Sequence, residues 1–147
     1  FFRKPELPEK GDPRNVVFVD LGHSKLTVTV ASFLAGKMRI ICHHSDRNLG
    51  ARNFDYLLAE RIGEEFNKKV GADPRKNIRA RLRMLDAIEK QRKILSANLE
   101  ATIHLECLLE DEDLRRNLQR KEFEELIGPQ IDNLTTVLAQ ALAMSGK

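Results

Sequence analysis

The sequence predicts a mixed fold of the α/β class in the broad sense (α+β), in which an antiparallel β meander is combined with helices. Apolar residues alternate with polar ones over 26–30 and 101–109, which is the period of a strand, and they recur at helical spacing over 54–70 and 78–95. The order is strands, helices, a strand and helices again, with no internal repeat. A chain of 147 residues with 41% hydrophobic content is long enough to bury one ordinary core.

The first predicted element is a meander of three antiparallel strands. Val16–Asp20 is a short apolar run that suits a buried strand, and 26–30 alternates as a half-buried strand does. Ala35-Gly36 then turns the chain into a third strand over 37–45. The proline-containing start has no hydrophobic period, so we expect a linker or a ragged fragment start over 1–14.

Two amphipathic helices are predicted next. The first covers 54–70, includes Phe54 and Phe66 as core residues, and ends at Gly71 as a cap. Asp73-Pro74 combines an N-cap residue with proline at the first helical position, which predicts the start of the second helix. That helix is expected to reach Leu95, and its buried stripe is expected to consist of Ile78, Leu82, Leu85 and Ile88.

The last third of the chain returns to strand and then to helix. Residues 101–109 alternate as a strand, and the acidic residues 110–113 follow. Two helical pieces are predicted over 121–127 and 130–144, because Gly128-Pro129 between them is a strong helix breaker.

Composition restricts the class of protein. No apolar run approaches the ~20 residues that span a bilayer, and the amino terminus lacks the apolar core of a secretory signal. Cys42 and Cys107 lie far apart in strand-like stretches, which predicts buried thiols in a reducing compartment and a cytoplasmic protein. The net charge of +3 indicates no particular partner.

A turn between the first two strands is the first candidate site. It begins Asp20-Leu21-Gly22, and backbone amides in such a turn can hold a phosphate. His23 and Ser24 follow where further glycines would let the backbone come closer to a phosphate.

One face of the second predicted helix is the other candidate. Its members share a spacing of i, i+3, i+4 and i+7, and they are Glu89, Arg92, Lys93 and Ser96. A carboxylate, two cations and a hydroxyl could hold a ribose and support a base. The same residues equally suit an exposed ion-pair face.

The sequence gives weaker evidence for other kinds of functional site. His43-His44 has no third ligand in view, so no metal site is predicted. Eight basic residues lie between Arg75 and Lys93, but no aromatic residue is interleaved among them for stacking on nucleic acid. No nucleophile, base and orienting group can be assembled, so no catalytic residue is predicted.

Four segments together resemble the heat shock protein 110 family, the large relatives of the heat shock protein 70 chaperones. They are DLGHSKLTVTV, NLGARNFDYLLAERIGEEF, EKQRKILSAN and RKEFEELI, from about Asn15 to the carboxyl terminus. The Asp-Leu-Gly-His-Ser turn is the specific part, since the smaller chaperones have Asp-Leu-Gly-Gly-Gly-Thr there. The resemblance implies the second lobe of an actin-like (ribonuclease H-like) ATPase domain. Its base would comprise 15–47 and 128–147, and an inserted helical and β cap would comprise 48–127.

The resemblance also implies a cofactor and the residues that bind it. ATP would be bound, with Mg²⁺ in the full-length parent and weakly or not at all by this fragment. The phosphate loop would comprise Asp20, Leu21 and Gly22, with His23, Ser24 and Lys25 in place of Gly-Gly-Thr; the adenosine side would comprise Glu89, Arg92, Lys93 and Ser96. Arg92-Lys93 is swapped relative to the Lys-Arg of the smaller chaperones, and Gly50-Ala51 departs from a Gly-Gly pair.

The implied function is that of a chaperone partner. The parent would act as a nucleotide exchange factor and co-chaperone for heat shock protein 70 and hold unfolded polypeptides through other regions, with no nucleic-acid or membrane partner. We expect no enzyme, because half the cleft would be missing and the bulkier turn suits weak or no turnover. An active heat shock protein 70-type ATPase and a basic nucleic-acid-binding module remain as alternatives. Arg75, Arg79 and Arg83 are expected to steer the partner.

Overall fold

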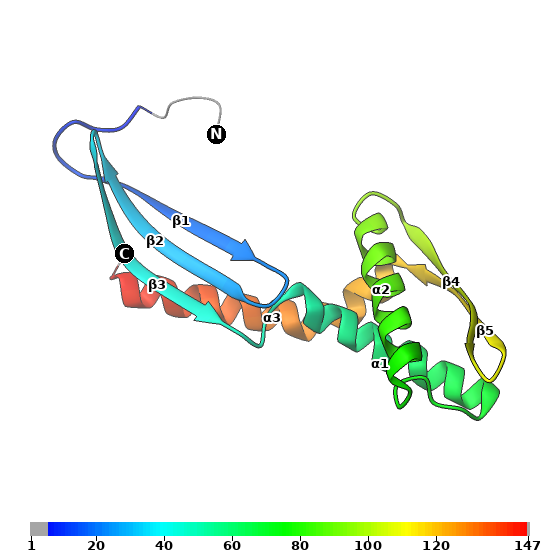
Figure 1. Cartoon of the computed structure of the whole chain (residues 1–147). Coiled ribbons are helices and arrows are strands. Elements are labelled where there is room, and N and C mark those ends of the chain that lie inside the picture. Colours follow the sequence, from blue (N-terminus) through cyan, green and yellow to red (C-terminus); the bar gives the residue numbers. More distant parts are fainter. Residues whose placement is uncertain (1–5, 147) are drawn as a thin grey trace. The chain divides into compact units, whose positions relative to one another are not determined.

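The computed structural model describes residues 6–146, which divide into two compact units (Figure 1). We call residues 6–51 with 130–146 the meander unit and residues 52–129 the hairpin unit. The expected linker at 1–14 lies partly outside the described residues. In the part that is described, the carbonyl of Pro8 accepts a hydrogen bond from the amide of Ala35 at 3.0 Å. Among the helices of residues 6–146, none has an apolar stretch long enough to span a bilayer.

The meander unit contains the predicted three-stranded antiparallel sheet, in the order β1-β2-β3. The strands are β1 (Arg14–Leu21), β2 (Leu26–Leu34) and β3 (Lys37–Asp46). Gly36 has φ +71°, a conformation that glycine adopts without steric cost in the tight turn between β2 and β3. The predicted meander is therefore confirmed.

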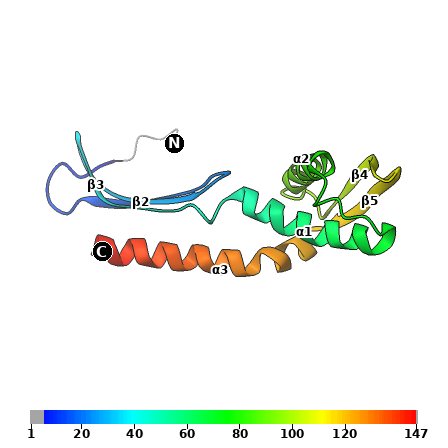
Figure 2. The same cartoon turned by 60° about the horizontal axis from the view of Figure 1, so that its bottom comes forward.

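One face of this sheet is covered by the carboxyl-terminal half of α3 (Arg120–Ser145), as Figure 2 shows. The core of the unit consists of Leu26, Val28, Leu49, Val137 and Ala141, all buried. Leu26 and Val28 are two residues apart on β2, so the strand period sends both side chains to the face that α3 covers.

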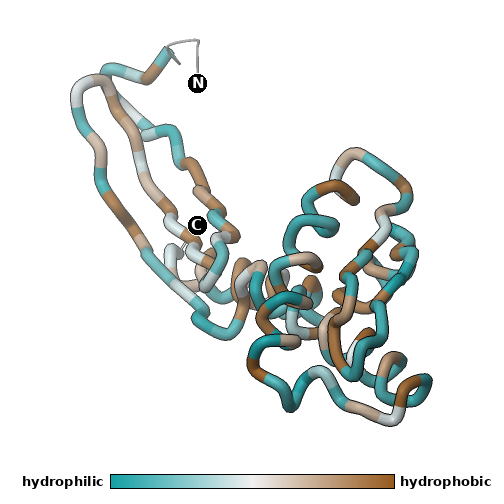
Figure 3. Tube along the Cα trace, turned by 45° about the vertical axis from the view of Figure 1, so that its right-hand side comes forward, coloured by the Kyte–Doolittle hydropathy of each residue, from teal (hydrophilic) through white to brown (hydrophobic). Residues whose placement is uncertain are grey.

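The prediction that β1 is buried is wrong. Val17, Phe18 and Val19 are 39%, 44% and 48% exposed. β1 is an edge strand of the sheet that residues 6–146 form, so it has a neighbouring strand, β2, on one side only. Hydropathy along the trace shows apolar segments on the strands of this unit (brown in Figure 3).

The hairpin unit packs two helices with a two-stranded antiparallel sheet. Its elements are α1 (Ala51–Val70), α2 (Ile78–Ile94), β4 (Glu100–Leu109), β5 (Glu112–Gln119) and the first part of α3. The core joins Leu58, Ile62 and Phe66 of α1 to residues of α2 and both strands. Phe54 and Phe66 are buried, as predicted.

Helix α2 differs from its prediction in start and in phase. Its N-cap is Asn77, whose side-chain oxygen accepts a hydrogen bond from the amide of Ala80 at 3.0 Å, so the helix does not begin at Asp73-Pro74. Ala80, Met84 and Ile88 form the buried stripe. Ile78 and Leu82 of the predicted stripe are 70% and 59% exposed. Apolar residues occur on more than one side of this helix, and packing in the unit selects the side that is buried.

Strand β5 was not predicted. It is polar apart from Leu114 and Leu118, which are buried, so it lacks the alternation that marked the other strands. Glu110 and Asp111 both have positive φ, 53° and 57°, as the two central residues of a type I′ hairpin turn do. The first half of the acidic stretch is thus a hairpin turn, and its second half begins β5.

Helix α3 is continuous, so the prediction of two helical pieces is wrong. Pro129 lies inside it and lacks the amide hydrogen that would bond one turn back. Tertiary contacts on both sides of this position outweigh the cost of one missing hydrogen bond.

Candidate functional site

The turn that joins β1 to β2 is tight and exposed. The amide of Gly22 donates to the carbonyl of Lys25 at 3.0 Å, and Leu21 pairs with Leu26 to close the hairpin. Asp20, His23, Ser24 and Lys25 are exposed. Within residues 6–146, the amides of His23 and Ser24 have no hydrogen-bond acceptor. These two amides are therefore available to an anion, and the Lys25 side chain adds positive charge beside them.

Gly50 fixes the path of this turn. A Cβ atom at position 50 would lie 2.6 Å from the carbonyl oxygen of His23 and 2.8 Å from the amide nitrogen of Lys25. The amide of Ala51 donates to the carbonyl of Gly22 at 3.0 Å. The beginning of α1 thus packs directly on the turn. Only glycine at position 50 allows this approach without a shift of the turn backbone.

The face near the carboxyl end of α2 is built from side chains. The Nζ of Lys93 lies 2.7 Å from Oε1 of Glu89, and Oγ of Ser96 donates to the carbonyl of Lys93 at 2.6 Å. The Lys93 side chain is 65% exposed. The structure therefore brings Glu89, Lys93 and Ser96 together on one exposed surface.

Arg92 is the fourth predicted member of this face, and it points elsewhere. Its Nε lies 2.5 Å from Oδ1 of Asp55 and its Nη2 lies 3.2 Å from Oδ2, so the pair is bidentate. Asp55 belongs to α1 and is buried. Sequence reasoning missed Asp55. The sequence did contain a signal for it: Asp55 is a carboxylate among the apolar residues of a buried helix face, and such a group needs a charged partner.

The basic residues of α2 and the segment before it are largely engaged inside the hairpin unit. Arg75 binds Asp73 at 2.8 Å and Glu60 at 2.9 Å, and Arg83 donates to the backbone carbonyls of Glu106 and Cys107. The hydrogen bond from Arg75 lowers the pKa of the Asp73 carboxyl.

Of the three cations expected to steer a partner, Arg79 alone is exposed with no partner among the described residues. Lys90 and Lys93 are paired with acids one turn away. Lys76 and Arg81 are exposed as well, so the unpaired part of the predicted basic face is smaller than its residue count suggests.

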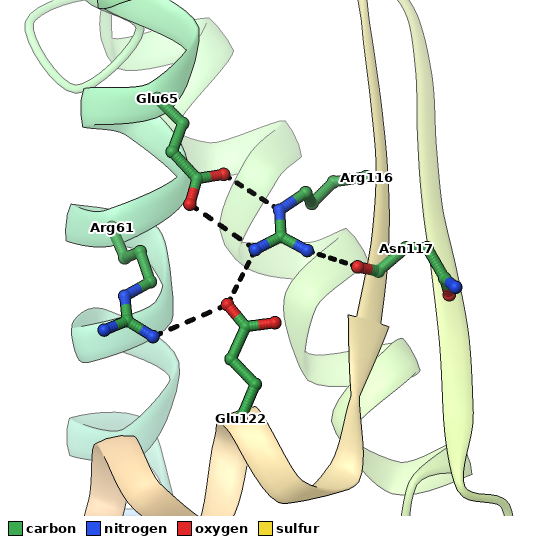
Figure 4. Close-up of polar contacts among 5 residues, drawn as sticks. All are labelled: Arg61, Glu65, Arg116, Asn117 and Glu122. Carbon is green, nitrogen blue, oxygen red and sulfur yellow. Dashed lines mark hydrogen bonds and ion pairs between the residues drawn. The ribbon is translucent and has the colours of Figure 1, made fainter.

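A second charge cluster, not predicted from the sequence, joins α1, β5 and α3 (Figure 4). The guanidinium of Arg116 lies between two carboxylates, 2.8 Å from Glu65 and 2.6 Å from Glu122. It also donates to the backbone carbonyl of Asn117, and Arg61 lies 3.5 Å from Glu122. The pKa of Arg116 is raised, mainly by its hydrogen bond with Glu65. Because its members come from three elements, spacing along the chain gives no sign of the cluster.

The histidines and cysteines have local roles. His43 Nδ1 lies 3.0 Å from Thr29 Oγ1, and the described residues contain no group of three side chains suited to a metal. Cys42 is a buried free thiol, as predicted, but Cys107 is exposed, so that half of the prediction is wrong. Cys107 has φ +43° in an irregular part of β4, where the strand period fails.

Comparisons with known proteins cover nearly the whole chain. The model of the family described as "Hsp70 protein" matches residues 7–146. "Heat shock 70 kDa protein 16" of Arabidopsis thaliana is 41% identical over 143 residues, which is 97% of this chain and 19% of that protein. A heat shock protein homolog of Saccharomyces cerevisiae is 38% identical over 143 residues, 97% of this chain and 21% of that protein. The chain thus spans about a fifth of the length of these curated relatives.

One expectation needs correction in view of these matches. The sequence analysis predicted that the protein is not an enzyme, because half of the cleft would be missing and the turn at 22–25 carries bulky residues. The matched family is a family of ATPases, so that expectation is wrong.

Proposed function

The chain belongs to the Hsp70 protein family, and we propose that its parent is a large chaperone of the heat shock protein 110 type that acts as a nucleotide exchange factor for heat shock protein 70. The chain itself is a segment of the actin-like, ATP-binding domain of that family. Unfolded polypeptides would be held by other regions of the parent.

The observation that carries the proposal is the turn at 22–25. Two exposed amides without an acceptor, a lysine beside them and a glycine contact that fixes the backbone together suit a phosphate group. We assign phosphate binding to the backbone of Asp20, Leu21, Gly22, His23, Ser24 and Lys25. Glu89, Lys93 and Ser96 are assigned to the adenosine side. When bound with Mg²⁺, ATP supplies the phosphoryl group whose transfer the domain catalyses.

Exchange would work by a shift of populations in the partner. A protein that binds the open form of heat shock protein 70 more tightly than the closed form raises the open fraction and releases nucleotide. Moving that equilibrium from 1:99 to 99:1 takes about 5.5 kcal/mol of differential affinity, which requires a broad interface. We assign Arg79, an exposed cation of α2, to such an interface; Arg75 and Arg83 are held inside the hairpin unit.

Release of labelled ADP from a heat shock protein 70 partner tests the proposal. Stopped-flow fluorescence with the full-length parent in excess is expected to show release that accelerates with parent concentration. Unchanged release at saturating parent would contradict an exchange function.

The same assay tests Arg79. Replacing it with glutamate should slow association at low salt, because exposed charges act mainly on the association rate. Lys121→Glu on α3 is a control, since Lys121 is likewise exposed and has no partner among the described residues.

A further inference from the structure

Asp55 is a buried carboxylate in a helix face that is otherwise apolar. It lies between Phe54 and Leu58 of α1, both buried, and it is 4% exposed. An ionised carboxylate in such a place is costly unless a cation and hydrogen bonds compensate it. Both of its oxygens are bonded to one guanidinium, that of Arg92.

Two neighbouring cations of α2 have different partners and different exposure. The Arg92 side chain is 17% exposed and lies against α1, whereas the Lys93 side chain is 65% exposed and lies beside Glu89. Without Asp55, Arg92 would be free to join Glu89, three residues before it on α2, and Ser96, four residues after it in the turn that follows the helix. The direction of Arg92 therefore depends on a residue of another helix.

We propose that Asp55 is a specificity-determining positioning residue: by binding Arg92, it leaves Lys93 as the single cation that this face offers to a nucleotide. This rests on the proposed ATP-binding function. An ammonium group presents a point charge, whereas a guanidinium is planar and can stack on a base. The face therefore contacts the adenosine through Glu89, Lys93 and Ser96, and it lacks a stacking cation.

The two ion pairs differ in how readily they can rearrange. The Lys93–Glu89 pair is exposed, and such pairs are weak enough to open when a ligand arrives. Breaking the Arg92–Asp55 pair would leave a buried carboxylate without a partner, which is strongly unfavourable. Lys93 can turn toward a ligand, and Arg92 is held in place.

Asp55→Asn in the full-length protein tests this most sharply. The amide keeps the shape of the side chain but no longer holds the guanidinium by charge, so Arg92 is released toward the face. ATP affinity measured by calorimetry is expected to rise about two- to fivefold, the range of an exposed cation stacking on a ring, while the thermal midpoint falls. A residue with only a structural role would lower both quantities. Asp86→Asn is the matched control, because it breaks an exposed pair on α2 and should change neither.

A second pair of variants keeps the proposal testable if Asp55→Asn does not fold. Lys93→Met should weaken ATP binding about threefold or more with little change in the thermal midpoint. Arg92→Met should lower the midpoint and leave the affinity of the folded fraction within about twofold. Asp55→Asn/Arg92→Met should recover part of the lost stability without changing affinity.

The outcomes of these experiments distinguish the proposed role of Asp55 from the proposed ATP-binding function. Equal loss of ATP affinity in Arg92→Met and Lys93→Met overturns the role of Asp55 and leaves ATP binding intact. Absence of ATP binding by the unmodified full-length protein overturns the proposed function itself.

Discussion

The turn at 22–25 and the face at 89–96 differ in what holds them together. Backbone atoms form the turn, through the hydrogen bond from Gly22 and the close approach of Gly50. Side chains form the face, and the direction of Arg92 is decided by Asp55 on another helix. A site built from backbone depends on local sequence, whereas a site built from side chains depends on partners that spacing along the chain does not reveal.

The largest expected effect concerns which stripe of α2 holds the hairpin unit together. Met84→Ala should lower the free energy of unfolding by about 2–4 kcal/mol, because Met84 is fully buried and its removal leaves a cavity. Leu82→Ala should change it by less than about 0.5 kcal/mol, because Leu82 is mostly exposed. Urea titration of both variants measures this. Equal losses would mean that the stripe predicted from the sequence is buried after all.

A smaller loss in the free energy of unfolding is expected when the charge cluster of Figure 4 is disrupted. Arg116→Met leaves Glu65 without its cation and Glu122 with only the 3.5 Å contact to Arg61, and it should cost about 1–2 kcal/mol, since the Arg116 side chain is 28% exposed. Arg61→Met is the control, because Arg61 makes one long contact and should cost less than about 0.5 kcal/mol. Thermal unfolding of the two variants measures both losses of stability. Equal losses would contradict a cluster that is centred on Arg116.

The role of the turn at 22–25 is best tested by the rate of ATP hydrolysis. Replacing His23, Ser24 and Lys25 with Gly-Gly-Thr in the full-length protein should raise ATP turnover severalfold, because a less bulky turn can follow the phosphate more closely. Steady-state hydrolysis measures the effect. Unchanged turnover would place the rate limit outside this turn.

The smallest expected effect is a dependence of stability on pH. Arg75 lowers the pKa of Asp73 below its ordinary value of 3.8, so the carboxylate contributes stability that is fully present above pH 3.8. That contribution is lost as the pH falls through the lower pKa of the folded state. Asp73→Asn should therefore flatten the acid limb of a thermal-midpoint profile and destabilise the protein near neutral pH. An unaltered acid limb would mean that Arg75 and Asp73 contribute nothing to this dependence.

The distinction between local sequence and distant partners also explains which parts of the fold and of the candidate site could be predicted from the sequence. The meander and the stripe of α1 were predictable because turn residues and apolar period agree there. Strand β5 was not, since two leucines four residues apart do not distinguish a strand from a helix. Residue types marked the turn at 22–25 as a candidate phosphate site, but only the structure shows that Gly50 packs on it. The partner of Arg92 lies 37 residues away and required the packing of two helices.

The measurement that tests the central claim most directly is ATP binding to the full-length protein with and without the close contact at Gly50. Gly50→Ala places a Cβ 2.6 Å from the turn backbone and is expected to displace the turn and weaken ATP binding by about tenfold in the folded fraction. Gly128→Ala, where a Cβ meets nothing within 4 Å, should bind ATP as the unmodified protein does. Equal ATP affinity in the Gly50→Ala variant and the unmodified protein would contradict the claim that this turn holds the nucleotide phosphates.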